Sequence, residues 1–321
     1  MIRQSWKLLI FAMLATGCSN GARFGVAPTE DTFSSTLYNN KVDIVWLVDD
    51  SSSMNIPQQK LAQTIPEMVS VLNSLKLDYR MVVTTTSMGV GFGGGRYIGN
   101  PSILTASTPD LVAVLQSRLL RGEMGNNLEE GLSSLQTLLS SDFLNQAGAG
   151  FHREEALLLI NVLSDEDDQS AGSSGSVVQS MVNRLNSFKR PFRPNVGGWI
   201  LNYIGVTGTC MNGIGQFLTG QRYMDLAAVS GGSSFPICSA NLGDAVRSLR
   251  ARVLEILTDY PLAQKPNLAS IRVYKDGIPV PESLTNGWSY IPNLQVIRFF
   301  GTAVPAVDSK IRVEFTPDSA G

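Results

Sequence analysis

The sequence is poor in several features on which common functions depend. It has a single histidine, His152, and no Gly-x-Ser-x-Gly motif, so a serine-hydrolase triad has no ready base or nucleophile elbow. The 25 basic residues are outnumbered by 27 acidic residues and form no basic block, so the positive surface that binds a phosphate backbone is missing. The three cysteines form no Cys-x-x-Cys pair or Cys/His cluster, which argues against structural zinc. We therefore expect no nucleic acid partner and no hydrolase of this type.

Apolar runs of strand length recur through the middle of the chain, separated by stretches in which apolar residues recur with helical period. Nearly continuous apolar runs are typical of central parallel strands that are covered on both faces. The alternation predicts an α/β class, with a doubly wound, mostly parallel sheet and a ligand site outside the carboxyl ends of its strands. Pro66 lies within the first helical stretch, so that helix is kinked there or restarts there. The apolar runs are residues 42–48, 79–83, 156–163 and 199–206.

Composition divides the chain into four parts. Residues 1–17 have the features of an export signal, and residues 18–40, which are rich in Ser, Asn, Gly and Thr, predict a flexible tether. Residues 41–260 carry the α/β pattern. Residues 261–321 consist of short alternating runs and turns, which predict a small all-β domain.

The N-terminal segment begins with basic residues, continues with an apolar run over residues 8–14 and ends in Ala-Thr-Gly-Cys. The run is far shorter than the ~20 apolar residues of a membrane span. Its end resembles the lipobox of bacterial lipoproteins, which implies that Cys18 is acylated, becomes the mature N-terminus and anchors the chain in the membrane. Ser19 after the cysteine implies an outer membrane lipoprotein, on the cell surface or the periplasmic face. The alternative is an ordinary cleaved signal.

The remaining two cysteines are Cys210 and Cys238. Three thiols in an oxidising compartment would leave one unpaired, and acylation of Cys18 removes the odd one. We therefore predict a Cys210–Cys238 disulfide, worth ~3 to 4 kcal/mol in the simple chain-entropy model. Two free buried thiols are the alternative.

Polar residues follow two of the apolar runs. Asp49, Ser51 and Ser53 form the pattern Asp-x-Ser-x-Ser, and residues two apart in an extended loop project the same way. Carboxylate and hydroxyl oxygens suit a hard cation such as magnesium. Asp165 ends another run and is expected to face the same crevice. The alternative for the serine loop is helix capping, by Ser53 or by Asn55.

Over roughly residues 42–257 the chain resembles von Willebrand factor A domains. Asp49, Ser51 and Ser53 match the first loop of the family's metal-ion-dependent adhesion site (MIDAS), and Asp165 matches the aspartate of its Thr-Asp-Gly loop. Alignment on the family's Gly-Thr-Asn-Ile helix start places Asn126 at the position of the threonine ligand. An asparagine carbonyl can also coordinate a hard cation.

The aspartate loop departs from the family pattern, and further acidic residues lie near it. In the aspartate loop, Ser164 replaces the family's threonine and Glu166 replaces its glycine. Of the acidic run 165–168, only Asp165 is expected to reach the metal, and the later acids lie behind it, form a calcium-binding rim or are solvated. The role of Glu129 is open, and one interpretation is a first-turn helix acid that the helix dipole favours.

The resemblance implies a binding module and not an enzyme. A divalent metal, magnesium or alternatively manganese or calcium, would keep an open coordination position and accept a carboxylate from a protein or surface ligand. A second hypothesis is a metal-dependent phosphohydrolase of the haloacid-dehalogenase type, which requires Asp-x-Asp where this chain has Ser51 in the second place. A third is a scaffold with a vestigial metal site, in which the β-rich part makes the contacts.

Overall fold

A computed structural model describes residues 29–33, 41–191, 197–208, 210, 219–247, 259–306 and 309–318. The predicted signal peptide and Cys18 lie outside the described residues. Within the described part of the chain, no helix has both the length and the apolar character needed to cross a membrane.

The larger unit is built on a five-stranded sheet of order β3-β2-β4-β5-β6, and every neighbouring pair is parallel. All eight residues of β4 are buried, as expected of a strand covered on both faces. The observed architecture confirms the predicted α/β class. The strands are β2 (Lys41–Val48), β3 (Asp78–Thr85), β4 (Leu157–Ser164), β5 (Trp199–Gly205) and β6 (Ser234–Pro236).

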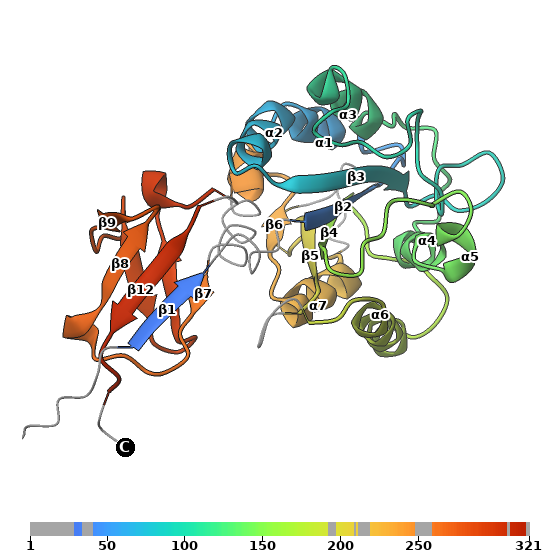
Figure 1. Cartoon of the computed structure of the whole chain (residues 1–321). Helices are drawn as coiled ribbons and strands as arrows, with labels where there is room; N and C mark the ends of the chain where they lie inside the picture. Colours follow the sequence, from blue (N-terminus) through green and yellow to red (C-terminus); the bar gives the residue numbers. More distant parts are fainter. Residues whose placement is uncertain are drawn as a thin grey trace, which may run out of the picture.

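Helices cover both faces of this sheet (Figure 1). The helices α1, α2 and α3 pack on one face, and α4, α6 and α7 pack on the other. The first helical stretch restarts at the proline: α1 ends at Ala62, and α2 carries Pro66 in its first turn, where a missing backbone N–H costs nothing. The helices are α1 (Asn55–Ala62), α2 (Ile65–Ser74), α3 (Leu111–Leu119), α4 (Gly131–Leu138), α5 (Ser141–Leu144), α6 (Ser174–Phe188) and α7 (Gln221–Ser230).

The order of the strands creates a switch point between β2 and β4. The chain adds β3 on one side of β2 and then adds β4, β5 and β6 on the other side. The loops after β2 and β4 therefore leave toward opposite faces of the sheet and open a crevice at its carboxyl edge. A hydrogen bond of 2.9 Å from Asp49 N to Leu163 O keeps the two strand ends together.

A buried ionic network lies at the amino ends of the strands, opposite the carboxyl edge. The apolar pattern of the sequence did not indicate it. Asp43, inside β2, accepts from Arg153 Nε at 2.8 Å and lies 3.4 Å from Lys189 Nζ. The lysine also donates to two backbone carbonyls, those of Arg153 and Ala156. Loss of one partner from such a buried group costs ~3 to 5 kcal/mol. The network is structural, and His152 beside it stacks on Phe188 with ring centroids 4.1 Å apart.

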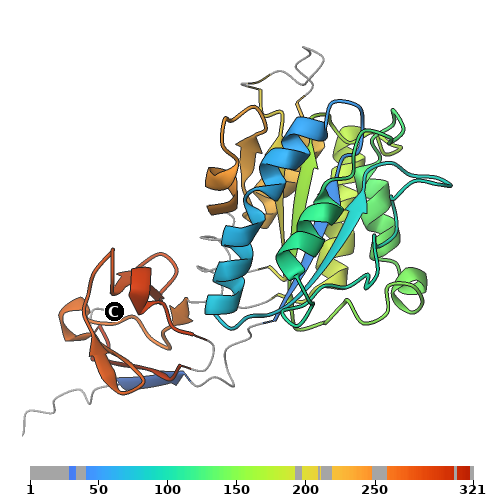
Figure 2. The ribbon, with the colours of Figure 1, turned by 90° about the horizontal axis from the view of Figure 1, so that it is seen from above.

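The smaller unit consists of two antiparallel sheets that enclose their own apolar core, as the sequence predicted (Figure 2). The sheet orders are β1-β12-β8-β9 and β10-β11-β7. Two short 3-10 helices, η1 (Leu268–Ser270) and η2 (Gly301–Ala303), lie in its connections. The strands are β1 (Thr29–Phe33), β7 (Tyr260–Pro261), β8 (Arg272–Lys275), β9 (Ile278–Val280), β10 (Trp288–Ile291), β11 (Val296–Phe299) and β12 (Ile311–Phe315).

The position of β1 corrects the predicted tether. Residues 29–33 form a strand antiparallel to β12, with Thr29 opposite Phe315 and Phe33 opposite Ile311. The physical reason is that β12 would otherwise present a row of unpaired backbone groups at a sheet edge, which an extended segment can satisfy. The small unit therefore contains strands from both ends of the chain.

Candidate functional site

Asp49 is the first residue after β2 and is fully buried. Its Oδ1 accepts from Ser51 N at 2.8 Å, and its Oδ2 accepts from Ser164 Oγ at 2.6 Å. These contacts fix the carboxylate against the ends of two strands. Burial raises the pKa of Asp49 to about 6, although the hydrogen bonds from Ser164 and Ser51 lower it, and the charge of Asp165 raises it further.

Asp165 is the first residue after β4 and is 2% exposed. It lies close enough to Asp49 for its negative charge to contribute to the raised pKa of that residue. The structure thus places both carboxylates at the switch point of the sheet, as expected from two parallel strands that end at one edge.

The serine loop turns between these strands and α1. Ser51 closes a turn, because its carbonyl accepts from Met54 N at 3.2 Å, and Ser53 lies half-buried within that turn. The Oγ of Ser51 is buried, and the Ser51 side chain acts on the Asp49 carboxylate, whose pKa it lowers. The capping alternative is not used: the N-cap of α1 is Met54, without a side-chain hydrogen bond, and Asn55 accepts instead from Gln59 Nε2 at 2.5 Å.

The side chain of Asn126, the residue aligned with the family's threonine, hydrogen-bonds to the backbone of two loops. Its Nδ2 donates to Met88 O at 2.9 Å, and its Oδ1 accepts from Leu128 N at 3.0 Å. The Nδ2 bond therefore holds the loop that precedes α4 against the loop that follows β3, and the Oδ1 bond closes a turn within the loop that precedes α4. The structure gives Asn126 a role in shaping the site, and another residue of the same loop faces Asp49.

That residue is Glu129, which the sequence interpretation placed wrongly. The helix α4 begins at Gly131 with Glu130 as its N-cap, so Glu129 lies outside the first turn. Its side chain is 1% exposed. Thr86 Oγ1 donates to its Oε2, and its Oε1 has no hydrogen-bond partner among the residues described.

The causes of the raised pKa of Glu129 show which groups lie near it. Burial raises its pKa to about 9, and the negative charges of Asp49, Asp50 and Glu166 contribute. The hydrogen bond from Thr86 acts in the opposite direction. Glu129 therefore belongs to the same acidic crevice as Asp49. The sequence offered one signal for Glu129. It lies in the loop between α3 and α4, which must cross the carboxyl edge of the sheet.

Two residues hold that crossing loop in place. Gln58 of α1 donates from Nε2 to Asp49 O at 2.8 Å and to Gly122 O at 3.0 Å, and its Oε1 accepts from Gly122 N at 2.9 Å. Gly125 N donates to Asp50 O at 2.8 Å. The loop after β2 and the loop before α4 are therefore one hydrogen-bonded assembly.

The acids that follow Asp165 have structural partners. Asp168 accepts from Leu132 N at 2.8 Å, at the start of α4, and from Arg222 Nη1 at 3.0 Å. Asp167 accepts from the backbone N of Arg222 at 2.9 Å. These contacts tie the acidic loop to α4 and α7, and Asp165 is the acid of this run whose charge contributes to the raised pKa of Asp49.

The chemistry of the crevice is that of hard oxygen donors. Two carboxylates, Asp49 and Asp165, lie beside the hydroxyl of Ser51 and the carboxyl group of Glu129. Within the described residues, no three His, Cys, Asp or Glu side chains come together closely enough to hold a metal ion. A cation here would therefore need hydroxyl groups and water for part of its shell, as Mg²⁺ commonly does. The buried hydroxyl of Ser51, beside the Asp49 carboxylate, fits that requirement.

The two cysteines of the described residues lie on the loops that follow β5 and β6. Cys210 is buried, Cys238 is exposed, and both are free thiols, so the predicted disulfide is not formed in the structure. The two side chains are nevertheless in contact. A hydrogen bond between them raises the pKa of the Cys238 thiol.

The fold is similar, at low identity, to solved structures of two kinds of protein. Proximal thread matrix protein 1 from the mussel byssus is 12% identical with a TM-score of 0.43, over 71% of this chain and 50% of that one. A second structure of it, with a zinc-occupied MIDAS motif, is 13% identical with a TM-score of 0.43, over 70% and 50%. The pilus adhesin SpaC from Lactobacillus rhamnosus GG is 13% identical with a TM-score of 0.44, over 86% and 39%.

This chain thus spans half the length of those structures or less. Likeness at this level says nothing of the ligand or activity of this chain. No protein-family model and no curated protein matches the sequence.

Proposed function

We propose that this chain is a cell-envelope lipoprotein that binds a protein or surface ligand through a divalent cation held at the carboxyl edge of the sheet. Asp49, Ser51, Ser53 and Asp165 would hold the cation, and Glu129 would add a carboxyl group from the third loop, which a bound cation would hold ionised. The observation that carries the proposal is Glu129 Oε1, a buried carboxyl oxygen with no hydrogen-bond partner among the described residues, in the same crevice as the buried Asp49.

A cation explains why such a crevice is tolerated. Burying carboxylates near one another is unfavourable unless a proton, an opposite charge or a metal compensates them. The largest influences on the pKa of Asp49 and of Glu129 are burial, hydroxyl donors and other acids. Oxygen donors with a high negative charge favour Mg²⁺, with Mn²⁺ or Ca²⁺ as alternatives.

Binding is favoured over catalysis by the residues that the crevice offers. A phosphohydrolase of the Asp-x-Asp type needs a second carboxylate where Ser51 stands. The single histidine, His152, lies at the opposite edge of the sheet, against Phe188. A cation that keeps one open position would instead accept a carboxylate from a partner, and this binding role is our proposal.

The metal site is tested by calorimetric titration with MgCl₂, MnCl₂ and CaCl₂. We expect the parent chain to bind at least one cation and Asp49→Ala to bind none. Glu129→Gln should lower the affinity by a factor of ~10 to 100, comparable to the loss of a group that supports a metal ligand. Asn126→Thr should lower the affinity, because it removes the hydrogen bond from Asn126 Nδ2 to Met88 O that helps to shape the loop.

The matched control is Asp142→Ala, which removes an exposed acid at the start of α5, remote from the site. Circular dichroism would establish that each variant is folded. Unchanged cation binding in both Asp49→Ala and Glu129→Gln would contradict the proposed site and favour the vestigial scaffold. Hydrolysis of a phosphate ester that depends on Asp49 would favour the enzyme.

A further inference from the structure

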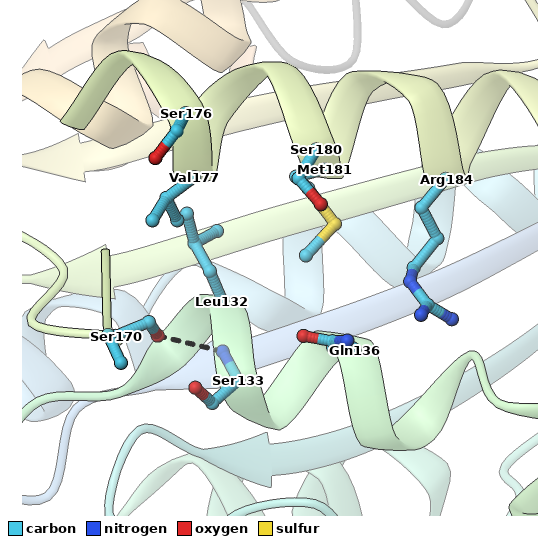
Figure 3. Close-up of a pocket in the computed structure, with 10 residues that line it drawn as sticks. Leu132, Ser133, Gln136, Ser170, Ser176, Val177, Ser180, Met181 and Arg184 are labelled. Carbon is cyan, nitrogen blue, oxygen red and sulfur yellow. Dashed lines mark hydrogen bonds between the residues drawn. The ribbon is translucent and has the colours of Figure 1, made fainter. Parts of the chain in front are cut away.

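A groove of about 340 Å³ lies between α4 and α6, outside the acidic crevice (Figure 3). Its walls come from α4, from α6 and from the loop that links β4 to α6. A volume of this size falls at the lower end of sites that bind small molecules or a few residues of a peptide. The lining residues used below are Leu132, Ser133, Gln136, Ser180, Met181 and Arg184.

We propose that this groove is a second recognition site, which binds a short extended peptide segment carrying an acidic side chain. Three observations support this: an unpaired cation at one end, an apolar floor, and hydroxyl and amide groups along both walls. The site is separate from the cation site and does not depend on it.

The unpaired cation is Arg184. It is half-buried, its side chain extends from α6 toward α4, and it makes no hydrogen bond or ion pair with any described residue. The described residues that line the groove include no acid. The other arginine near this loop, Arg222, is engaged by Asp168 at 3.0 Å. A guanidinium in a groove without a carboxylate is suited to a carboxylate from outside.

The floor and walls define the rest of the ligand. Leu132 and Met181 are buried beneath the groove, and together with Val177 they offer a surface for one aliphatic side chain. Ser133 and Gln136 lie on the α4 side, and Ser180 lies on the α6 side (Figure 3). Their side chains can hydrogen-bond the backbone amides and carbonyls of an extended chain.

The length of the groove favours a peptide of three or four residues. It runs along α6 from Ser176 to Arg184, a distance of ~12 Å at 1.5 Å per residue. An extended peptide covers ~3.3 Å per residue, so ~4 residues span that distance. None of the described lining residues is aromatic, which disfavours a saccharide, whose rings usually stack on aromatic faces.

The proposal is tested on the full chain by NMR titration with acetyl-Ser-Val-Ser-Asp-amide and the reversed acetyl-Asp-Ser-Val-Ser-amide, each with an Asn counterpart. We expect one Asp peptide to shift the amides of residues 132–136 and 176–184 saturably, and its Asn counterpart to bind about tenfold more weakly. Arg184→Gln should lower the affinity for the Asp peptide to that of the Asn peptide.

Two matched controls separate the groove from general effects. Arg96→Gln removes an exposed arginine elsewhere and should leave binding unchanged. Ser180→Phe should fill the groove and abolish binding, whereas Gln179→Phe, at an exposed neighbouring position of α6 that does not line the groove, should not. Addition of EDTA should have no effect, so failure of this proposal and of the cation site can be distinguished.

Several outcomes would overturn the proposal. They are an absence of shifts in the groove with every peptide, equal binding of the Asp and Asn peptides, and unchanged binding in Arg184→Gln. Inorganic phosphate that displaces the peptide with equal affinity would show a simple anion site and would also overturn it.

Discussion

At the scale of single residues, Gly125 shows how closely the loops at the carboxyl edge are packed. A Cβ atom added there would lie 2.5 Å from Ser87 Oγ and 2.7 Å from both the backbone O and Oδ1 of Asp50. The Ser87 hydroxyl is already bound, since it donates to Asp50 Oδ1 at 2.7 Å and accepts from Asn126 N at 3.0 Å. No neighbour can move without loss of a hydrogen bond.

We therefore predict that Gly125→Ala lowers the free energy of unfolding by ~1 to 3 kcal/mol, the usual cost of overpacking, and weakens cation binding. Urea denaturation and calorimetry would measure the two effects. The control is Gly175→Ala in α6, where an added Cβ meets no atom within 4 Å, so that variant should be neutral or slightly more stable. Equal stabilities of the two variants would show that the loop adapts.

The sequence predicted some of the site residues and missed one. Asp49 and Asp165 follow apolar strands directly, and parallel strands end at one edge, so their proximity is predictable. Asn126 and Glu129 lie in a loop with no periodicity, where the direction of each side chain depends on hydrogen bonds to other loops. Thr86 and Met88, which make those hydrogen bonds, are distant in sequence. Only the folded loop shows that Glu129 faces Asp49.

At the scale of elements, the loops after β5 and β6 lie side by side at the carboxyl edge. The parallel pairing of these strands places Gly205 opposite Pro236, and the two cysteines follow shortly after. The contact between Cys210 and Cys238 is therefore a consequence of strand register. A covalent bond at this position would link two loops that otherwise depend on noncovalent contacts.

We predict that Cys210 and Cys238 form a disulfide under oxidising conditions, because the thiols already lie in hydrogen-bond contact. Mass spectrometry after alkylation would detect it, and the bridge should add up to ~3 to 4 kcal/mol to the free energy of unfolding. In Cys238→Ser, reductant should no longer change stability. Full alkylation of both thiols without reductant, in chain isolated from an oxidising compartment, would rule out the disulfide.

The elements differ in how well their pattern could be predicted. Strands such as β4 are continuous apolar runs, and Pro66 marks the start of α2 through its missing N–H, so both are encoded locally. The strand β1 is not, because its partner β12 lies at the other end of the chain. A polar segment becomes a strand only where a sheet edge is available to it.

At the scale of the whole molecule, pairing of β1 with β12 limits how far the folded units can lie from the N-terminal region. If Cys18 is the mature N-terminus, the segment between it and Thr29 has ten residues, which span at most ~35 Å when fully extended. The longer tether predicted from composition would have allowed more than twice that reach. The small β unit would thus be the part held nearest to the membrane.

The last prediction is that Cys18 is acylated and anchors the chain. Each buried CH₂ of an acyl chain contributes ~0.8 kcal/mol, and stable attachment needs two membrane-binding signals, which a diacylated cysteine provides. Cys18→Ser should therefore move the chain from the membrane fraction to the soluble fraction and change its electrophoretic migration. Its thermal unfolding should be unchanged, because the described fold begins at Thr29.

Cys238→Ser is the matched control, since it removes an exposed thiol without removing the candidate lipid site and should remain in the membrane fraction. A Cys18→Ser chain that stays membrane-associated with unaltered migration would contradict acylation. The pairing of β1 has its own consequence in intact membranes: a protease should cleave poorly within residues 29–33 while β1 is paired with β12. Rapid cleavage within β1 in the anchored chain would mean that β1 leaves β12 at the membrane surface.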